Sequence, residues 1–189
     1  MNHRIFIAVN LPEEVKKSLV SYQMNWPDLP IRWTKKENLH ITLVFLGYVN
    51  DEELPEICRI VQEVASRNRS LVVNLKKIIY GPNDKKPPRM VWAEGEKSNK
   101  MGKLQGELEY SLSNSLNKTE IKESRSYSPH ITLGRIRTWE LRRIEEEEKP
   151  DVNQEISLNF EVNSIEIMGS FLKRKGPDYV ILESCPLKD

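Results

Sequence analysis

The tetrapeptide His-Ile-Thr-Leu occurs twice in this chain of 189 residues, at His40–Leu43 and at His130–Leu133. The two copies contain two of the three histidines, and each lies in the same order of predicted elements. Strand, helix, strand with the tetrapeptide, helix and strand follow one another in residues 1–81 and again in residues 88–170. The repeat therefore predicts a single domain, 1–189, built from two pseudo-symmetric halves.

The predicted elements have apolar residues at alternating positions in strands and at helical spacing in helices. Strands are expected at Arg4–Val9, Ile31–Thr34, Leu39–Leu46, Leu71–Ile79, Arg89–Glu94, Pro129–Arg137, Ile156–Met168 and Tyr179–Leu182. Helices are expected from Pro12 to Trp26, from Asn50 to Ala65, from Ser98 to Leu116 and over Thr138–Lys149. We predict an α+β fold with two pseudo-symmetric lobes around a central cleft, each a mostly antiparallel sheet with helices on its outer face.

Composition narrows the class of protein. The net charge is +1 and hydrophobic residues make up 38%, which is typical of an ordinary globular protein and not of one that coats nucleic acid by charge alone. No apolar run is long enough to span a membrane, and the N-terminus lacks the apolar stretch of a signal peptide. We therefore expect a cytoplasmic monomer with no membrane partner.

Side chains two residues apart on a strand point to the same face of the sheet. His40 and Thr42 should therefore project together, as should His130 and Thr132. The intervening apolar residues of the first strand are expected to face the core: Ile41, Leu43 and Phe45. If the two strands meet across a cleft, they present two imidazoles flanked by two hydroxyls.

Such a set of groups suits the hydrolysis of a phosphodiester. A neutral imidazole can take a proton from attacking water, while an imidazolium on the opposite side of phosphorus can protonate the departing oxygen. The hydroxyls of Thr42 and Thr132 can donate hydrogen bonds to the non-bridging phosphate oxygens. This chemistry needs neither a metal nor another cofactor, and we predict none.

The paired histidines also fit three roles without acid–base catalysis. A histidine on a strand can simply be packed or solvated, and the repeat can be a structural duplication without activity. A zinc site needs at least three protein ligands, threonine is a poor one, and neither tetrapeptide has a third histidine nearby. His3 begins the first strand without a partner motif and is assigned no role.

The two tetrapeptides lie in longer segments that resemble the H-x-T-x motifs of the 2H phosphoesterase superfamily. These segments are Asn38–Gly47, with its trailing Phe-Leu-Gly, and Ser128–Arg135. Within that superfamily the chain is similar to RNA 2′,3′-cyclic phosphodiesterases, also called 2′-5′ RNA ligase-like proteins. Supporting matches lie at Arg4–Val9, Ile31–Thr34, Arg89–Ala93 and Gly176–Leu187.

The resemblance implies a bilobal α+β fold and metal-independent opening of a terminal 2′,3′-cyclic phosphate to a 2′-phosphate. It implies that His40 is the proton donor and His130 the proton acceptor, roles that the identical motifs cannot separate by themselves. The partner would be RNA with a 2′,3′-cyclic phosphate end, or a related small cyclic nucleotide. Two alternatives stay open, namely 2′-5′ RNA ligation and binding of RNA ends or nucleotides without turnover.

The resemblance also implies a phosphate contact by Arg135, five residues after the second histidine. Strict alternation would point Arg135 away from His130. Either the strand bulges near Gly134, or the side chain curls round the strand end, or Arg135 is structural. Trp33 and Tyr179 could stack a terminal base or pack in the core, and basic residues such as Arg32 could follow the RNA backbone or serve solubility.

Overall fold

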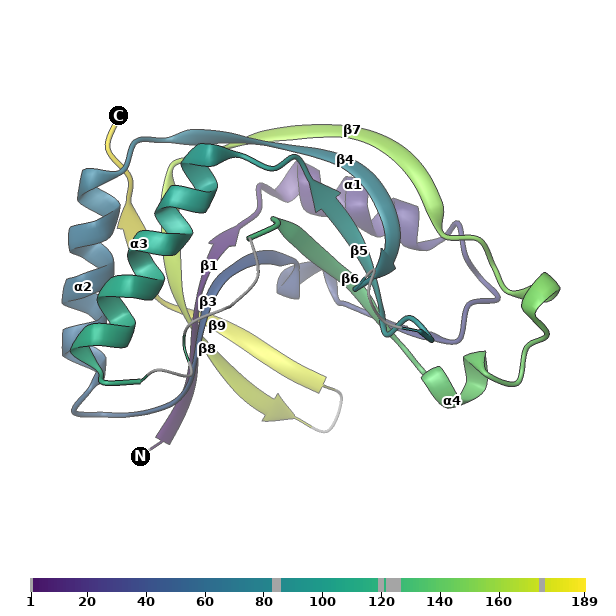
Figure 1. Ribbon diagram of the computed structural model, residues 1–189, viewed down its shortest axis with the longest axis horizontal. Coiled ribbons are helices and arrows are strands. Elements are labelled where there is room, and N and C mark those ends of the chain that lie inside the picture. Colours follow the sequence, from purple (N-terminus) through teal and green to yellow (C-terminus); the bar gives the residue numbers. More distant parts are fainter. Residues whose placement is uncertain (1, 83–85, 119–120, 122–126, 174–175) are drawn as a thin grey trace.

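The computed structural model describes the chain apart from residues 1, 83–85, 119–120, 122–126 and 174–175. Its centre is one strongly curled, nine-stranded sheet in the order β7-β4-β5-β6-β3-β1-β8-β9, with β2 beside β6 (Figure 1). The named strands pair antiparallel, and their bounds are β1 Asn2–Asn10, β2 Ile31–Trp33, β3 His40–Asn50, β4 Leu71–Gly81, β5 Met90–Gly95, β6 His130–Ile136, β7 Asn153–Val162, β8 Ser164–Lys173 and β9 Gly176–Pro186. The α+β class and the mostly antiparallel sheet predicted from the sequence are confirmed.

The helices lie on the sheet in two groups. Helices α2 (Leu54–Arg67) and α3 (Asn99–Ser115) lie side by side, with α2 on β8 and β9 and α3 on β3 (Figure 1). Helix α1 (Glu13–Gln23) contacts β6 and β7 instead. The other helical segments are short: α4 (Thr138–Leu141), η1 (Lys36–Asn38) and η3 (Glu146–Glu148).

The two copies of the sequence repeat interlock. We call β3-β1-β8-β9 the first half-sheet and β6-β5-β4-β7 the second half-sheet. Strand β4 comes from the first copy but pairs within the second half-sheet. Helix α1 also comes from the first copy and packs on the second half-sheet. Strand β8 comes from the second copy but pairs within the first half-sheet. Helix α3 also comes from the second copy and packs on the first half-sheet. Each half-sheet therefore depends on both copies, and one continuous apolar cluster joins them.

Two predicted elements differ from those found by more than a shift of their ends. The single strand expected over Ile156–Met168 is two strands, because its alternation changes phase: Val162 is buried, Asn163 and Ser164 are not, and Ile165 is buried again. The chain crosses at this point from the second half-sheet to the first. The helix expected over Thr138–Lys149 ends at Leu141 as an α-helix, since the following Glu145–Glu148 run offers no apolar side chain to bury.

Side-chain hydrogen bonds lie at the start of α3 and in the turn just before α2. The Asn50 side-chain oxygen accepts hydrogen bonds from the backbone N–H groups of Glu52 and Glu53, both at 2.9 Å, and the Glu53 carboxylate accepts from the Asn50 N–H. This reciprocal pair of bonds has the form of a capping box and closes the turn before α2, whose own N-cap residue, Glu53, makes no side-chain cap bond. Ser98 Oγ accepts from the Met101 N–H at the start of α3.

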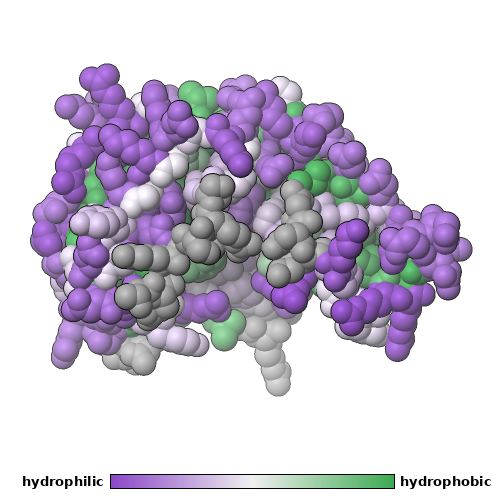
Figure 2. All heavy atoms as spheres, viewed as in Figure 1, coloured by the Kyte–Doolittle hydropathy of each residue, from purple (hydrophilic) through white to green (hydrophobic). Residues whose placement is uncertain are grey.

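The surface is mostly polar. Figure 2 shows that hydrophilic residues dominate the face seen in Figure 1 and that apolar residues show there only in small separate patches. Among the helices that the structure describes, none is both long and apolar enough to cross a membrane.

Candidate active site

The two tetrapeptides pair with each other at the junction of the half-sheets. Ile41 of β3 lies opposite Ile131 of β6, and the strands run antiparallel. This register places His40 beside Thr132 and Thr42 beside His130, so all four side chains share one face. Ile41 and Ile131 are fully buried on the other face and hold the strands from behind.

A bulge follows each H-x-T segment. Between β1 and β3 the register passes from Ala8 and Thr42 to Ile7 and Val44, which leaves Leu43 as an extra residue. Between β5 and β6 it passes from Trp92 and Thr132 to Val91 and Gly134, which leaves Leu133 as an extra residue. The repeat therefore extends to the same irregularity at the same place in both strands.

These bulges decide where the next side chains point. Phe45 lies opposite Phe6 and is 61% exposed, so the expectation that it faces the core is wrong. The reason is that the extra residue at Leu43 turns Phe45 to the face of the histidines. By the same shift Arg135 lies opposite Met90, two residues from Trp92, and therefore shares the face of His130 and Thr132. Of the three possibilities open for Arg135, the bulge is the one found.

His40 lies in an aromatic environment. Its Nδ1 is 2.7 Å from the Asn38 carbonyl oxygen and its Nε2 is 3.0 Å from Thr42 Oγ1. The rings of Phe6 and Tyr179 lie 5.0 and 5.2 Å from the His40 ring. Burial lowers the pKa of His40 below its usual value; the charges of Lys16 and His130 lower it further, and the hydrogen bond to Asn38 raises it. The charge of one imidazole thus acts on the other.

His130 has a different aromatic neighbour and a carboxylate beside it. Its Nδ1 is 2.9 Å from the Ser128 carbonyl oxygen, and the Trp92 ring stacks on it at 4.0 Å between ring centroids. Glu94 lies directly opposite His130 in the β5–β6 register. Burial lowers the pKa of His130, while the hydrogen bond to Ser128 and the charge of Glu94 raise it.

The hydrogen bonds fix the same tautomer on both rings. A carbonyl oxygen can only accept, so Nδ1 of His40 and Nδ1 of His130 each carry a proton that is donated to the carbonyl two residues earlier. Nε2 is then the nitrogen that gains or loses a proton at each ring. Both imidazoles can accordingly act in acid–base chemistry through Nε2 without a change of tautomer.

The two aromatic residues named from the sequence have different surroundings. Trp33 packs against the apolar core, and a methyl group at Gly134 would overlap its ring. Tyr179 lies edge-on to His40 and packs on a small cluster of Phe6, Ala8 and Met168. Of the two, only Tyr179 lies beside the histidine pair.

Five residues near the site were not singled out from the sequence: Phe6, Trp92, Glu94, Tyr127 and Gln23. Trp92 and Glu94 share a face of a predicted strand, and that alternation could have indicated them. Tyr127 donates its hydroxyl proton to the Thr42 carbonyl at 2.9 Å. The buried Gln23 amide donates to the carbonyls of Leu133 and Thr34. Neither contact has a local sequence signal, because each joins distant parts of the chain.

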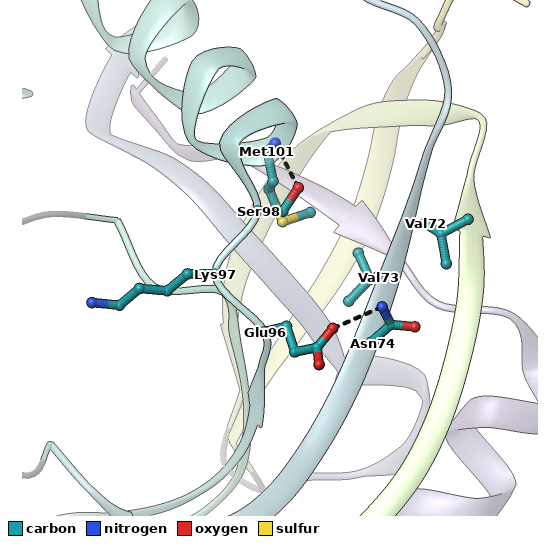
Figure 3. A pocket seen from close by; sticks show the side chains of 7 residues that line it. All are labelled: Val72, Val73, Asn74, Glu96, Lys97, Ser98 and Met101. Atoms are coloured by element: carbon teal, nitrogen blue, oxygen red, sulfur yellow. Dashed lines mark hydrogen bonds between the residues drawn. The ribbon is translucent and has the colours of Figure 1, made fainter.

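A separate hollow lies between the start of β4, the end of β5 and the start of α3 (Figure 3). Its polar side chains are satisfied locally: Asn74 donates to Glu96 at 2.9 Å, and Ser98 caps α3. Lys97 points away from the other labelled residues. The hollow contains none of the predicted site residues, and we assign it no function. The residues lining it are Val72, Val73, Asn74, Glu96, Lys97, Ser98 and Met101.

Neither the third histidine nor a metal-type cluster adds to the site. His3 contacts Asp51 at 2.7 Å, at the opposite end of the β1–β3 pair from His40. Within the described ranges of the chain, no group of three or more His, Cys, Asp or Glu side chains could hold a metal ion.

The chain is similar to known proteins over most of its length. Residues 9–92 match the family described as LigT like Phosphoesterase. The chain is similar to the RNA 2′,3′-cyclic phosphodiesterase of Methanocaldococcus jannaschii, with 30% identity over 185 residues that cover 95% of this chain and 98% of the relative. The corresponding protein of Thermotoga maritima is 31% identical over 188 residues, covering 96% of this chain and 94% of the relative.

The fold is also similar to a solved structure. The crystal structure of TT0787 of Thermus thermophilus matches with a TM-score of 0.83 and 30% identity over 97% of each chain. The resemblance seen in the motifs is thus confirmed over nearly the whole length. The chain belongs to the LigT-like 2H phosphoesterases, in the family of the RNA 2′,3′-cyclic phosphodiesterases.

Proposed function

We propose that this protein is an RNA 2′,3′-cyclic phosphodiesterase that opens a terminal 2′,3′-cyclic phosphate to a 2′-phosphate. The observation that carries the proposal is the pairing of the two tetrapeptides at Ile41 and Ile131, which brings two imidazoles and two hydroxyls to one face. The chain is similar over nearly its whole length to proteins named RNA 2′,3′-cyclic phosphodiesterase, and this similarity supports the same activity.

In the proposed mechanism His130 is the base and His40 the acid. Neutral His130 accepts a proton at Nε2 from the water whose oxygen attacks phosphorus. As the new P–O bond forms, the bond between phosphorus and the 3′-oxygen breaks, and protonated His40 gives its Nε2 proton to that oxygen. Each proton transfer of this kind typically contributes about 10²–10⁴-fold to the rate.

Three side chains of the same face are proposed to bind the non-bridging oxygens of the phosphate. Thr42 and Thr132 lie beside the two histidines in the register and can donate hydroxyl protons. The guanidinium of Arg135 can donate hydrogen bonds and offsets the developing negative charge. The mechanism needs no metal and no other cofactor.

The decisive experiment is incubation of the purified protein with an oligoribonucleotide that ends in a 2′,3′-cyclic phosphate, in excess EDTA. We expect hydrolysis that leaves a 2′-phosphate, and loss of activity by about 10²-fold or more in His40→Ala and in His130→Ala. His3→Ala is the matched control and should keep full activity. Undiminished turnover in both variants of the paired histidines contradicts the proposal.

Two further measurements separate the alternative activities. A joined product from two RNA fragments would indicate 2′-5′ ligation, and tight binding of a 2′-phosphate end without hydrolysis would indicate a binding module. The proposal takes RNA ends or related small cyclic nucleotides as partners and a cytoplasmic monomer as the working form. Sedimentation or size-exclusion measurements test the oligomeric state.

A further inference from the structure

A second arginine lies directly beside Arg135. In the β2–β6 pair Arg32 is the register partner of Arg135, between the pairs Ile31–Ile136 and Trp33–Gly134. Directly opposite residues of an antiparallel pair point to the same face. The bulge at Leu133 turns that face of Arg135 toward His130 and Thr132, so Arg32 also lies on the face of the candidate active site.

The arginine pair adjoins the His40 end of the site. Strand β3 begins at His40, which lies opposite Thr132 of β6. Beyond Thr132, the strand that pairs with this edge of β6 is β2. Arg32 and Arg135 therefore follow directly after the row formed by His40 and Thr132. The row formed by His130 and Thr42 lies one residue pair further from the two arginines along the same face.

The start of β9 lies next to the Arg32 guanidinium, and Tyr179 of the same strand lies beside His40. Gly176, with φ +120°, lies so close to the Arg32 guanidinium that a Cβ there would overlap it. Burial raises the pKa of Tyr179, and the charges of Arg4 and Arg135 counteract that rise. The start of β9 thus brings Tyr179 beside His40 and keeps the guanidinium of Arg32 at the edge of the same site.

Arg32 adds a second guanidinium to the face that carries Arg135. Guanidinium groups are suited to phosphate, which they bind through two parallel hydrogen bonds. The reaction geometry says which phosphate this would be. In an in-line displacement the water and the leaving oxygen lie on opposite sides of phosphorus, so the ribose that carries the leaving oxygen lies on the side of His40.

We propose that Arg32 binds a second phosphate, the one on the 5′-oxygen of the terminal nucleotide, while Arg135 beside it keeps its contact with the cyclic phosphate. This inference rests on the proposed function and specifies its substrate class. The arginine pair lies on the ribose side of the site, where the chain of an RNA leaves the terminal nucleotide. An oligonucleotide end is then the preferred substrate, and a nucleoside 2′,3′-cyclic phosphate with a free 5′-hydroxyl is a poor one.

The test is a series of substrates that differ only at the 5′-oxygen: adenosine 2′,3′-cyclic phosphate, the same compound with a 5′-phosphate, and a dinucleotide with a cyclic end. We expect kcat/KM of the unaltered protein to rise by about tenfold or more when the 5′-phosphate is added. Arg32→Gln should abolish that gain and leave the rate on the 5′-hydroxyl compound unchanged. Arg32→Lys should keep part of the gain, because it keeps the charge and loses the paired hydrogen bonds.

Salt dependence gives a second readout. The logarithm of kcat/KM should fall more steeply with salt for the dinucleotide than for the 5′-hydroxyl compound, by about 0.7 per phosphate bound, and Arg32→Gln should remove the difference. Arg142→Gln, which removes an exposed cation of the second half of the sequence, is the control and should change neither measurement.

Each outcome decides between the proposals. Equal rates on the 5′-hydroxyl and 5′-phosphate compounds overturn the inference and leave the phosphodiesterase intact. An equal loss on all three substrates in Arg32→Gln also overturns it, since Arg32 would then act on the cyclic phosphate or on folding. No turnover of any of the three by the unaltered protein rejects the proposed function itself.

Discussion

Ile41 and Ile131 are opposite each other in the one register pair that joins β3 to β6, and both are fully buried. The histidine and threonine that flank each isoleucine point to the opposite face of the sheet from the isoleucine. The Ile41–Ile131 pair therefore lies near a pseudo-two-fold axis of the site. The two-fold relation is broken by the neighbours: Phe6 and Tyr179 accompany His40, whereas Trp92 and Glu94 accompany His130. An asymmetric substrate can therefore be bound in one orientation.

The pH dependence should reflect two buried imidazoles. In the proposed mechanism kcat/KM rises with pH as His130 becomes neutral and falls as His40 loses its proton. Because burial lowers the pKa of both groups, we expect the falling limb to lie below the usual histidine value of 6.5.

The charge of Lys16 provides a sharper form of this prediction. That charge lowers the pKa of His40, so Lys16→Gln should raise it and move the falling limb to higher pH. Lys17→Gln, on the exposed side of the same helix, is the control and should leave the profile in place. A shift of the rising limb in place of the falling limb would argue against His40 as the acid.

The threonine hydroxyls should contribute to the rate and not to folding. We expect Thr42→Val and Thr132→Val each to lower kcat by about 10²-fold, the usual effect of removing one donor from a developing oxyanion. Thr42→Ser and Thr132→Ser keep the hydroxyl and should recover most of the activity. Single-turnover kinetics with the cyclic oligonucleotide measure the effect, and valine variants with full kcat would remove the threonines from the mechanism.

Gln23 should stabilise the bulge that orients Arg135. Its buried amide donates to the Leu133 carbonyl at 3.1 Å and to the Thr34 carbonyl at 3.0 Å. In Gln23→Leu these bonds are lost, and we expect the free energy of unfolding to fall by about 1–3 kcal/mol. Chemical denaturation measures the change. Gln62→Leu removes an exposed glutamine bonded to Glu183 and should change stability by less than about 0.5 kcal/mol.

Gly81 should be needed for the stack of Trp92 on His130. A methyl group at Gly81 would overlap the six-membered ring of Trp92, whose centroid lies 4.0 Å from that of His130. Gly81→Ala should therefore displace the indole, destabilise the fold by about 1–3 kcal/mol and lower kcat by up to about 10²-fold.

Tryptophan fluorescence, denaturation and kinetics test this together. The control is Gly106→Ala in α3, where a methyl group meets open space and a helix gains about 0.5–1 kcal/mol from alanine. A Gly81→Ala protein with the stability and rate of the parent would show that the indole can move without effect.

Much of the site could be predicted because each histidine and its threonine are two residues apart on the same strand. His40 and Thr42 share a face, as do His130 and Thr132, since alternation of side chains is a property of any strand. The order of elements around each tetrapeptide indicated the duplication and the α+β class. The position of Phe45 was wrong and that of Arg135 was left open, because alternation fails wherever a strand takes an extra residue.

That extra residue has no sequence signal of its own. Leu43 and Leu133 become bulges through their pairing with β1 and β5, and the Leu133 carbonyl is held by Gln23 from a helix 110 residues away in sequence. The placement of Arg32 next to Arg135 arises in the same way, from the pairing of β2 with β6. The break between β7 and β8 is a further case, since it marks the crossing between half-sheets.

The amino-acid sequence by itself indicated which residues are candidates for the chemistry and determined which neighbours share their face, because side-chain type and the geometry of one strand are enough for both. Only the tertiary structure decided that the two histidines lie on one face of two paired strands, that Arg32 and Arg135 share this face, and that Phe45 is exposed. Those relations depend on which strands pair and in which register, and register is set by the packing of the whole sheet.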